Sequence, residues 1–313
     1  MEASHDATVA AAAALLRRTK ESGGSLLVLT GAGMSVSSGV PVFRSADGSM
    51  SAEFVAFLAA YNAARRAAGL EDADDWFSFS VPEMFRRETE AEAWAYWRWR
   101  TLRALVEPAP DYTQLSKLLA YFEANAFVQT SNCDQLHVRA ALSADRVMEI
   151  HGSLGRVQCA AGCTQRLWPV DGEFLERLRA EPEWVPRCSS CKTACLRPNV
   201  MIFMDGSFVD SELQRQQTNL RDFEDACADG LDVNADKNAV VLEIGAGVVV
   251  PSIRSTAEHK GSQGVGLIRV NPSREACEQM QVSFGPEALG GKYFPLAMRG
   301  AEAMERLTAA LGI

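Results

Sequence analysis

Short apolar runs alternate with longer amphipathic stretches along the chain. The apolar runs are too short for helices and are typical of parallel strands buried on both faces; they cover residues 26–29, 126–132, 147–150, 239–244 and 264–270. Helical periodicity covers residues 7–20, 51–68, 82–106, 111–123 and 302–311. Strands that alternate with helices predict an α/β fold built on a doubly wound parallel sheet.

The first apolar run ends in a turn in which Gly31 and Gly33 flank Ala32. Small residues let backbone N–H groups approach a diphosphate, but the third position of the usual G-x-G-x-x-G pattern falls on Val36. By itself this turn is compatible with a nucleotide site or with an ordinary strand-to-helix connection. A second Gly-Ala-Gly turn, at residues 245–247, allows a second close approach of the backbone.

Polar side chains follow two other apolar runs. Asn132 and Asp134 come at the end of the second run, and His151 comes directly after the third. Open α/β sheets bind their ligands at the carboxyl ends of the strands. The sequence therefore predicts a ligand site that these side chains share with the glycine turns.

Composition narrows the class of protein. Of 313 residues, 47% are hydrophobic and 23% charged, which is typical of a globular protein, and the net charge of -9 argues against nucleic-acid binding by bulk electrostatics. The aromatic and arginine-rich residues 94–100 could form a nucleic-acid surface or a packed helical insertion, and the acids that flank them favour the insertion. No run approaches the roughly 20 apolar residues of a membrane helix, and the first residues lack a basic signal segment. We expect an intracellular protein, cytoplasmic or nuclear, without contact to a membrane; the oligomeric state is left open.

Since no export signal is evident, we do not expect the eight cysteines to form disulfides. Their clustering needs another reason, because four of them form two closely spaced pairs. Cys159 and Cys163 are separated by three residues, and Cys188 and Cys191 by two. Two such knuckles can bring four thiolates to one tetrahedral zinc ion, and four protein ligands indicate a structural site. Buried thiols or a redox pair are the alternatives, and Cys195 could take the place of Cys191.

Six motifs stand in a fixed order along most of the chain. They are Gly31-Ala-Gly-Met-Ser-Val-Ser-Ser-Gly-Val-Pro-Val-Phe-Arg44, Thr130-Ser-Asn-Cys-Asp-Gln-Leu-His137, His151-Gly-Ser153, the cysteine pairs, Arg197-Pro-Asn-Val200 with Phe203, and Gly245-Ala-Gly247 with Asn271. Together they resemble the sirtuin family of NAD-dependent protein deacylases, and within it a divergent bacterial-type branch. The resemblance implies a Rossmann-like NAD-binding domain of residues 1–44, 111–152 and 201–313. A smaller domain would combine a helical insertion, 45–110, with a zinc module, 153–200.

The resemblance also implies roles for individual residues. His151 would be the general base and Asn132 would hold the ribose, which makes these two the catalytic candidates. The NAD-binding candidates are Gly31, Ala32, Gly33, Ser35, Phe43, Arg44, Ser131, Asn132, Cys133, Asp134, Gly245, Ala246, Gly247 and Asn271. The zinc ligands would be Cys159, Cys163, Cys188 and Cys191. An acyl-lysine protein or peptide would bind beside Phe203, Met204 and Asp205.

Departures from the family pattern leave the reaction open at this point. Val42 and Ser131 stand where the family usually has Asp and Gln, and residues 245–247 stand where it has Gly-Thr-Ser. Some related proteins linked to macrodomains transfer ADP-ribose to protein, but they lack the base histidine, and this chain keeps His151. The sequence therefore favours deacylation over ADP-ribosyl transfer, NAD hydrolysis or NAD binding without catalysis. Arg100 is compatible with binding an acidic acyl group, although an ordinary ion-pair role is the favoured interpretation.

Overall fold

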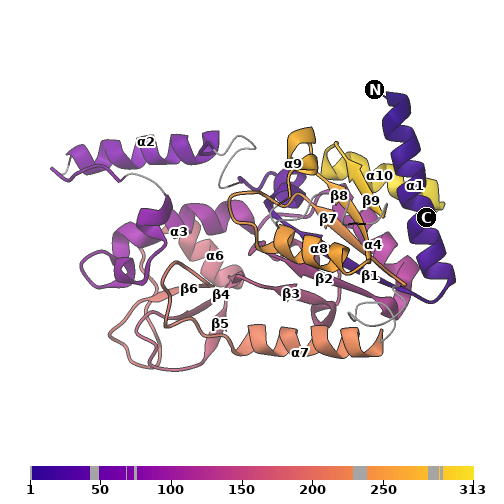
Figure 1. Cartoon of the computed structure of the whole chain (residues 1–313). Helices are drawn as coiled ribbons and strands as arrows, with labels where there is room; N and C mark the ends of the chain where they lie inside the picture. Colours follow the sequence, from indigo (N-terminus) through magenta and orange to yellow (C-terminus); the bar gives the residue numbers. More distant parts are fainter. Residues whose placement is uncertain are drawn as a thin grey trace.

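A six-stranded parallel sheet forms the centre of the computed structural model, which describes residues 2–42, 49–67, 69–73, 76–227, 238–280, 289 and 292–313 (Figure 1). Its strand order is β3-β2-β1-β7-β8-β9, and every neighbouring pair is parallel. The strands are β1 (Ser25–Thr30), β2 (Ala126–Thr130), β3 (Val147–Glu149), β7 (Ala239–Ile244), β8 (Gly266–Val270) and β9 (Tyr293–Leu296). The connection reverses direction between β1 and β7, which is where such sheets open a crevice for a ligand.

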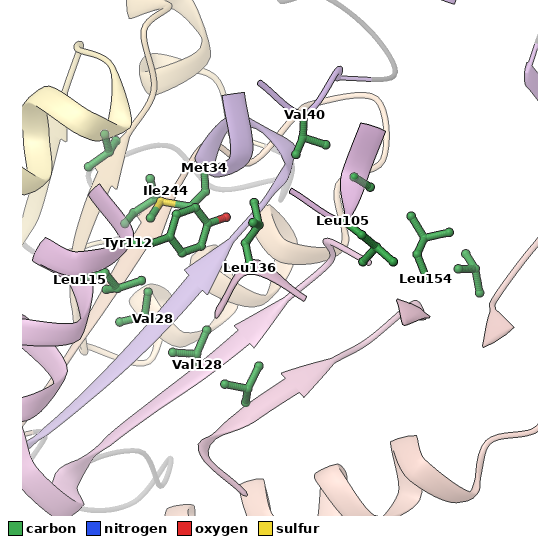
Figure 2. Close-up of a cluster of buried hydrophobic side chains, with 14 of the residues drawn as sticks. Val28, Met34, Val40, Leu105, Tyr112, Leu115, Val128, Leu136, Leu154 and Ile244 are labelled. Carbon is green, nitrogen blue, oxygen red and sulfur yellow. The ribbon is translucent and has the colours of Figure 1, made fainter. Parts of the chain in front are cut away.

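Both faces of this sheet are covered, as its continuous apolar strands require. Leu26 and Val28 of β1 belong to one buried core, and Leu27 and Leu29 to another on the opposite face. Figure 2 shows part of the first core, with Val28 near Leu115. The covering helices are α1 (Glu2–Glu21), α4 (Pro110–Phe122) and α10 (Gly300–Leu311) on one face, and α7 (Ser211–Ala226) and α8 (Ser252–Ser262) on the other.

A small antiparallel sheet lies at the other end of the molecule (Figure 1). It consists of β5 (Leu167–Pro169), β4 (Gly152–Cys159) and β6 (Leu196–Val200), in that order. The helix α3 (Glu90–Ala104) packs against it, and Trp94 Nε1 donates a hydrogen bond to the Leu196 carbonyl at 2.8 Å. The helices α2 (Ala52–Ala67) and α6 (Gly172–Ala180) complete this region. The remaining elements are η1 (Ala32–Ser38), η2 (Trp76–Phe79), η3 (Pro82–Phe85), η4 (Glu123–Asn125), α5 (Leu136–Arg139), η5 (Ala144–Arg146) and α9 (Arg274–Glu278).

The predicted fold class is confirmed, and one predicted helix is wrong. Residues 82–106 do not form one long helix, because Arg86 has an extended backbone with φ -72° and ψ 159°. The short helix η3 ends there with Phe85 buried in the core, and α3 begins after Thr89, whose side chain makes no capping hydrogen bond. No helix within the described ranges is long and apolar enough to cross a membrane.

Candidate functional site

The two glycine turns lie against each other at the carboxyl ends of β1 and β7. Gly31 N donates to the Ile244 carbonyl and Gly33 N donates to the Gly245 carbonyl, both at 3.0 Å. A Cβ atom at Gly33 would lie only 2.7 Å from the Cα atom of Gly245. The glycines at 31 and 33 are therefore needed for contact between the turns. From the sequence we expected these glycines to offer backbone N–H groups to a diphosphate. The N–H groups of Gly31 and Gly33 instead donate to the second turn and are not available to a ligand.

Asn132 and Asp134 meet Ser35 in a buried polar cluster beside these turns. Ser35 Oγ donates to Asp134 Oδ2 at 2.6 Å, and Asn132 Nδ2 donates to Ser35 Oγ at 2.9 Å. Burial raises the pKa of the Asp134 carboxyl, and the hydrogen bond from Ser35 opposes that rise. The first turn and the loop after β2 are thus joined by side chains as well as by backbone.

The amide of Asn132 has a fixed orientation. Its Nδ2 atom also faces the Gly31 carbonyl at 2.9 Å, and a carbonyl oxygen can only accept. Both amide protons are consequently used inside the protein, on Gly31 and on Ser35. The atom of Asn132 that remains for a ligand is the acceptor Oδ1.

His151 lies in the turn between β3 and β4, half-buried, beside the same loop. Burial lowers the pKa of its imidazole, and a hydrogen bond with the Ser131 backbone partly offsets this effect. The His151 carbonyl lies 3.6 Å from Cys133 Sγ and accepts from Met201 N at 2.9 Å. The imidazole is therefore held in its neutral form near pH 7, the form that can take up a proton.

The other predicted cofactor residues surround this cluster. Ser131 N donates to the Thr30 carbonyl at 3.0 Å, and Asn271 Nδ2 donates to the Ala246 carbonyl at 3.2 Å. Burial raises the pKa of the Cys133 thiol, which keeps it protonated and unsuited to act as a nucleophile. Ala32 is half-buried and Gly247 is exposed. Phe43 and Arg44 lie outside the described residues.

Arg100 is buried on α3 and reaches toward the same region. Its Nη1 donates to the Pro41 carbonyl at 2.5 Å, and its charge acts on Asp134 and Cys133. Of the ordinary ion-pair roles expected for Arg100, surface or structural, the surface one does not match this environment, since Arg100 is only 7% exposed. The guanidinium instead anchors the end of the segment that follows η1.

The loop after β6 presents apolar side chains to solvent. Phe203 is 39% exposed and Met204 79% exposed, and Met201 beside them is 43% exposed. Asp205 is different, because its carboxylate is fully buried and lies 2.5 Å from Arg197 Nη2. Of the predicted substrate residues on this loop, only Phe203 and Met204 therefore offer side chains to a bound chain.

The four predicted zinc ligands converge on one point. Their sulfur atoms all lie within 4.8 Å of one another, with Cys159 and Cys191 separated by 4.0 Å and Cys163 and Cys188 by 3.6 Å. Sulfurs bonded tetrahedrally to zinc at about 2.3 Å lie about 3.8 Å apart, so the cluster fits one zinc ion. Cys195 is not the fourth ligand, because its thiol faces the Phe85 carbonyl at 3.4 Å.

The sequence analysis did not identify the buried residues that hydrogen-bond to residues of the site. Tyr112 OH lies 3.0 Å from Ser35 Oγ, and His137 Nε2 lies 2.8 Å from Thr30 Oγ1. Arg197 was noticed only as part of a motif. Such residues could have been found from the sequence by looking for a side chain with a polar group at a position where the helical pattern predicts burial, as at Tyr112 on α4.

Comparison with known proteins places the chain in a family. The model of the Sir2 family matches residues 31–227. An NAD-dependent protein deacylase 1 of Pseudomonas aeruginosa is 32% identical over 79% of this chain and 82% of its own length. An NAD-dependent protein deacylase of Aeropyrum pernix is 30% identical over 92% of each chain.

The fold agrees with solved structures. The crystal structure of a Sir2 homolog–NAD complex superposes with a TM-score of 0.62 and 23% identity, covering 95% of this chain and 92% of the other. A Sir2 complex with a p53 peptide and NAD gives a TM-score of 0.60 at 20% identity, over 92% and 93% of the two chains. With the family model and the two relatives in agreement, this chain belongs to the Sir2 family.

Proposed function

We propose that this chain is an NAD-dependent protein-lysine deacylase that transfers an acyl group from lysine to ADP-ribose and releases nicotinamide. The observation that carries the proposal is the half-buried position of His151 beside the Asn132–Asp134 loop, where burial lowers the pKa of its imidazole. Proteins that only bind NAD have no need of a base at this point. The Sir2 relatives named as NAD-dependent protein deacylases support the same reaction.

The side chains at the sheet edge fit a dinucleotide. Asn132 offers an amide oxygen, Asp134 a carboxylate and Asn271 an amide, which are groups that bind ribose hydroxyls and a carboxamide. They line the ends of β2 and β8, on both sides of the switch point between β1 and β7. Gly247 is exposed and an added Cβ there would meet nothing within 4 Å, so space exists for a ligand beside the second turn.

Each residue has a distinct task in the proposed reaction. NAD, when bound, supplies the ribosyl carbon that receives the acyl oxygen and the nicotinamide that leaves. Asn132 accepts a hydrogen bond from a ribose hydroxyl through Oδ1, and Asp134 recognises the carboxamide. His151 takes the proton from a ribose hydroxyl, which then becomes able to attack the acyl carbon. Held geometry and exclusion of water supply the rest of the rate enhancement.

We place the acyl-lysine substrate along the loop after β6, where Phe203 and Met204 are exposed. An extended peptide can add to such a segment through its main chain.

Residues 1–44, 111–152 and 201–313 would form the NAD-binding domain, and residues 45–110 and 153–200 the smaller domain. All eight cysteines are free of disulfides, which suits the reducing interior of a cell.

Nicotinamide release tests the proposal directly. The protein is incubated with NAD and with acetyl-, succinyl- or long-acyl-lysine peptides, and the products are identified by mass. We expect release of nicotinamide that depends on the acyl-peptide, together with O-acyl-ADP-ribose and free lysine. ADP-ribose bound to protein without any need for acyl-lysine would reject deacylation in favour of ADP-ribosyl transfer.

A further inference from the structure

Tyr112 is a buried tyrosine whose hydroxyl reaches the polar cluster from the covering helix α4. The residue is 0% exposed, and its ring stands edge-on to His137 with centroids 5.1 Å apart. In Figure 2 the ring lies next to Met34, and its oxygen is turned toward Leu136 and away from Leu115. This oxygen lies 3.0 Å from Ser35 Oγ, and the Asn132 side chain also acts on the phenol. A phenol buried at that depth is costly unless its hydrogen bond is made.

The protons around Ser35 determine the direction of this bond. A serine hydroxyl has one proton to donate and two lone pairs that accept. Its proton goes to Asp134 Oδ2, since a carboxylate can only accept. One lone pair takes a proton from Asn132 Nδ2, so the other is left for the phenol of Tyr112. Tyr112 is therefore the donor, and Ser35 has no capacity left for a ligand.

We infer that Tyr112 is a positioning residue, which acts through Ser35 to hold the Asn132 amide and the Asp134 carboxylate in their binding orientations. This inference rests on the proposed NAD-dependent function, because it assigns those two side chains to NAD. A donated proton from Tyr112 strengthens the hydrogen bond that Ser35 in turn donates to Asp134. The same bond keeps Ser35 from rotating, so that the Asn132 amide stays with Oδ1 toward the ligand.

The arrangement restricts what the site can bind. Asn132 presents only an acceptor and so selects a ligand group with a proton to give, such as a hydroxyl. Asp134 still has acceptor capacity, since it receives Ser35 at Oδ2 and the Leu136 amide at Oδ1, 3.0 Å away. A carboxamide, with two N–H protons, matches that remaining capacity. Without the phenol, Ser35 could turn and accept in other directions, and both preferences would be relaxed.

The first experiment compares Tyr112→Phe with the matched control Tyr121→Phe, which makes the same change on the same helix at a half-buried position. Carboxyl groups are titrated by ¹³C NMR in the protein without NAD, and Asp134→Asn identifies the Asp134 signal. The charged and titratable groups around Asp134 are Arg100, Cys133 and Tyr112. We expect Tyr112→Phe to raise the pKa of Asp134 by about 0.5, because the Ser35 bond weakens, and Tyr121→Phe to leave it unchanged.

The second experiment is a double-mutant cycle on NAD affinity, measured by calorimetry. Tyr112→Phe should weaken NAD binding by about tenfold. In the Ser35→Ala background the same change should alter affinity less than twofold, because the residue through which Tyr112 acts is gone. Equal effects of Tyr112→Phe in both backgrounds, or an Asp134 pKa equal to that of the wild type, would overturn the inference.

Failure of the proposed function gives a different result. If the wild-type protein binds no NAD, the function is wrong, while the Asp134 titration still decides whether Tyr112 acts through Ser35. If the wild type binds NAD and releases nicotinamide but Tyr112→Phe behaves like Tyr121→Phe, only the positioning role is wrong. A general loss of folding in Tyr112→Phe would appear as a lower melting temperature together with changes at carboxyl groups far from Asp134, and would also contradict the inference.

Discussion

The guanidinium of Arg197 lies 2.5 Å from the carboxylate of Asp205, and neither side chain is more than 1% exposed. Arg197 also donates to the Val200 carbonyl at 3.2 Å. The pair therefore fastens both ends of the short segment that exposes Met201, Phe203 and Met204. In the proposed function, this buried ion pair would hold the surface that meets a peptide substrate.

Asp205→Asn removes one charge of this pair and leaves the other buried. Breaking a buried ion pair in this way costs about 3–5 kcal/mol, so we expect the free energy of unfolding in urea to fall by that amount. Asp210→Asn makes the same chemical change at an exposed position, where the carboxylate accepts from Gln214 Nε2, and should cost less than about 0.5 kcal/mol. A small loss in Asp205→Asn would show that the Arg197 charge finds water or another partner.

His151→Ala should abolish formation of O-acyl-ADP-ribose, with a drop in turnover of about 10²- to 10⁴-fold. Burial lowers the pKa of His151 from its ordinary value of 6.5, so the neutral base is present at pH 7. We expect kcat/KM of the wild type to fall only when the pH drops below about 6.5, as the imidazole gains a proton. The exposed His259 on α8 supplies the control His259→Ala, which should keep wild-type turnover. Full activity in His151→Ala would exclude it as the base.

Cys188→Ser should lower zinc content from one ion per chain toward none and destabilise the small sheet, because zinc binding is coupled to folding. The matched change is Cys195→Ser, at a cysteine that is equally buried but outside the cluster. We expect that variant to retain its zinc, as measured by atomic absorption on the purified protein. Loss of metal from Cys195→Ser with retention in Cys191→Ser would reverse the ligand assignment.

The buried, neutral His137 should make the folded protein less stable as the pH falls. Thr30 Oγ1 uses its proton on Thr130 Oγ1, so His137 Nε2 must be the donor to Thr30, and Nδ1 is buried without a partner among the described residues. Burial lowers the pKa of His137 to about 3, whereas the unfolded chain takes up this proton near 6.5. The unfolded state thus binds more protons between these values, and stability is lost as the pH falls below about 6.5.

The variant His137→Gln keeps a donor for Thr30 but cannot titrate. Between pH 6 and pH 4 its free energy of unfolding should fall less steeply than that of the wild type, by about 1.4 kcal/mol for each pH step of one. Urea denaturation at several pH values measures the two slopes. His259→Gln, a change at an exposed histidine, should retain the wild-type slope. Parallel slopes for His137→Gln and the wild type would disprove a neutral buried His137.

Most of the central sheet could be predicted from sequence, because five of its six strands carry an apolar run of their own, whereas no predicted run covers the edge strand β9. The run 239–244 corresponds to β7 residue for residue, and the end of the 126–132 run correctly located Asn132 at a strand end. The paired cysteines were equally informative, since their spacing alone anticipates four sulfurs at one point. The helix expected over 82–106 failed because no proline or glycine marks the extended backbone at Arg86.

Supporting residues of the site could not be predicted because their partners are distant in sequence. Tyr112 looks like an ordinary core residue in the pattern of α4, and only the fold brings its hydroxyl to Ser35. Asp205 shows the reverse case. A carboxylate in a loop suggests an exposed side chain, and only the structure shows that it pairs with the buried Arg197. Sequence patterns report which face a residue occupies, but not which atom it meets there.

The contact between Gly33 and Gly245 limits which substitutions the two turns can accept. An added Cβ at either position would meet backbone of the other turn at 2.6–2.7 Å, so neither turn can gain a side chain there unless both move. The two halves of the sheet edge must therefore change together. The two turns are already joined by hydrogen bonds in the folded chain, so the binding free energy of a dinucleotide would not be reduced by a cost of ordering them.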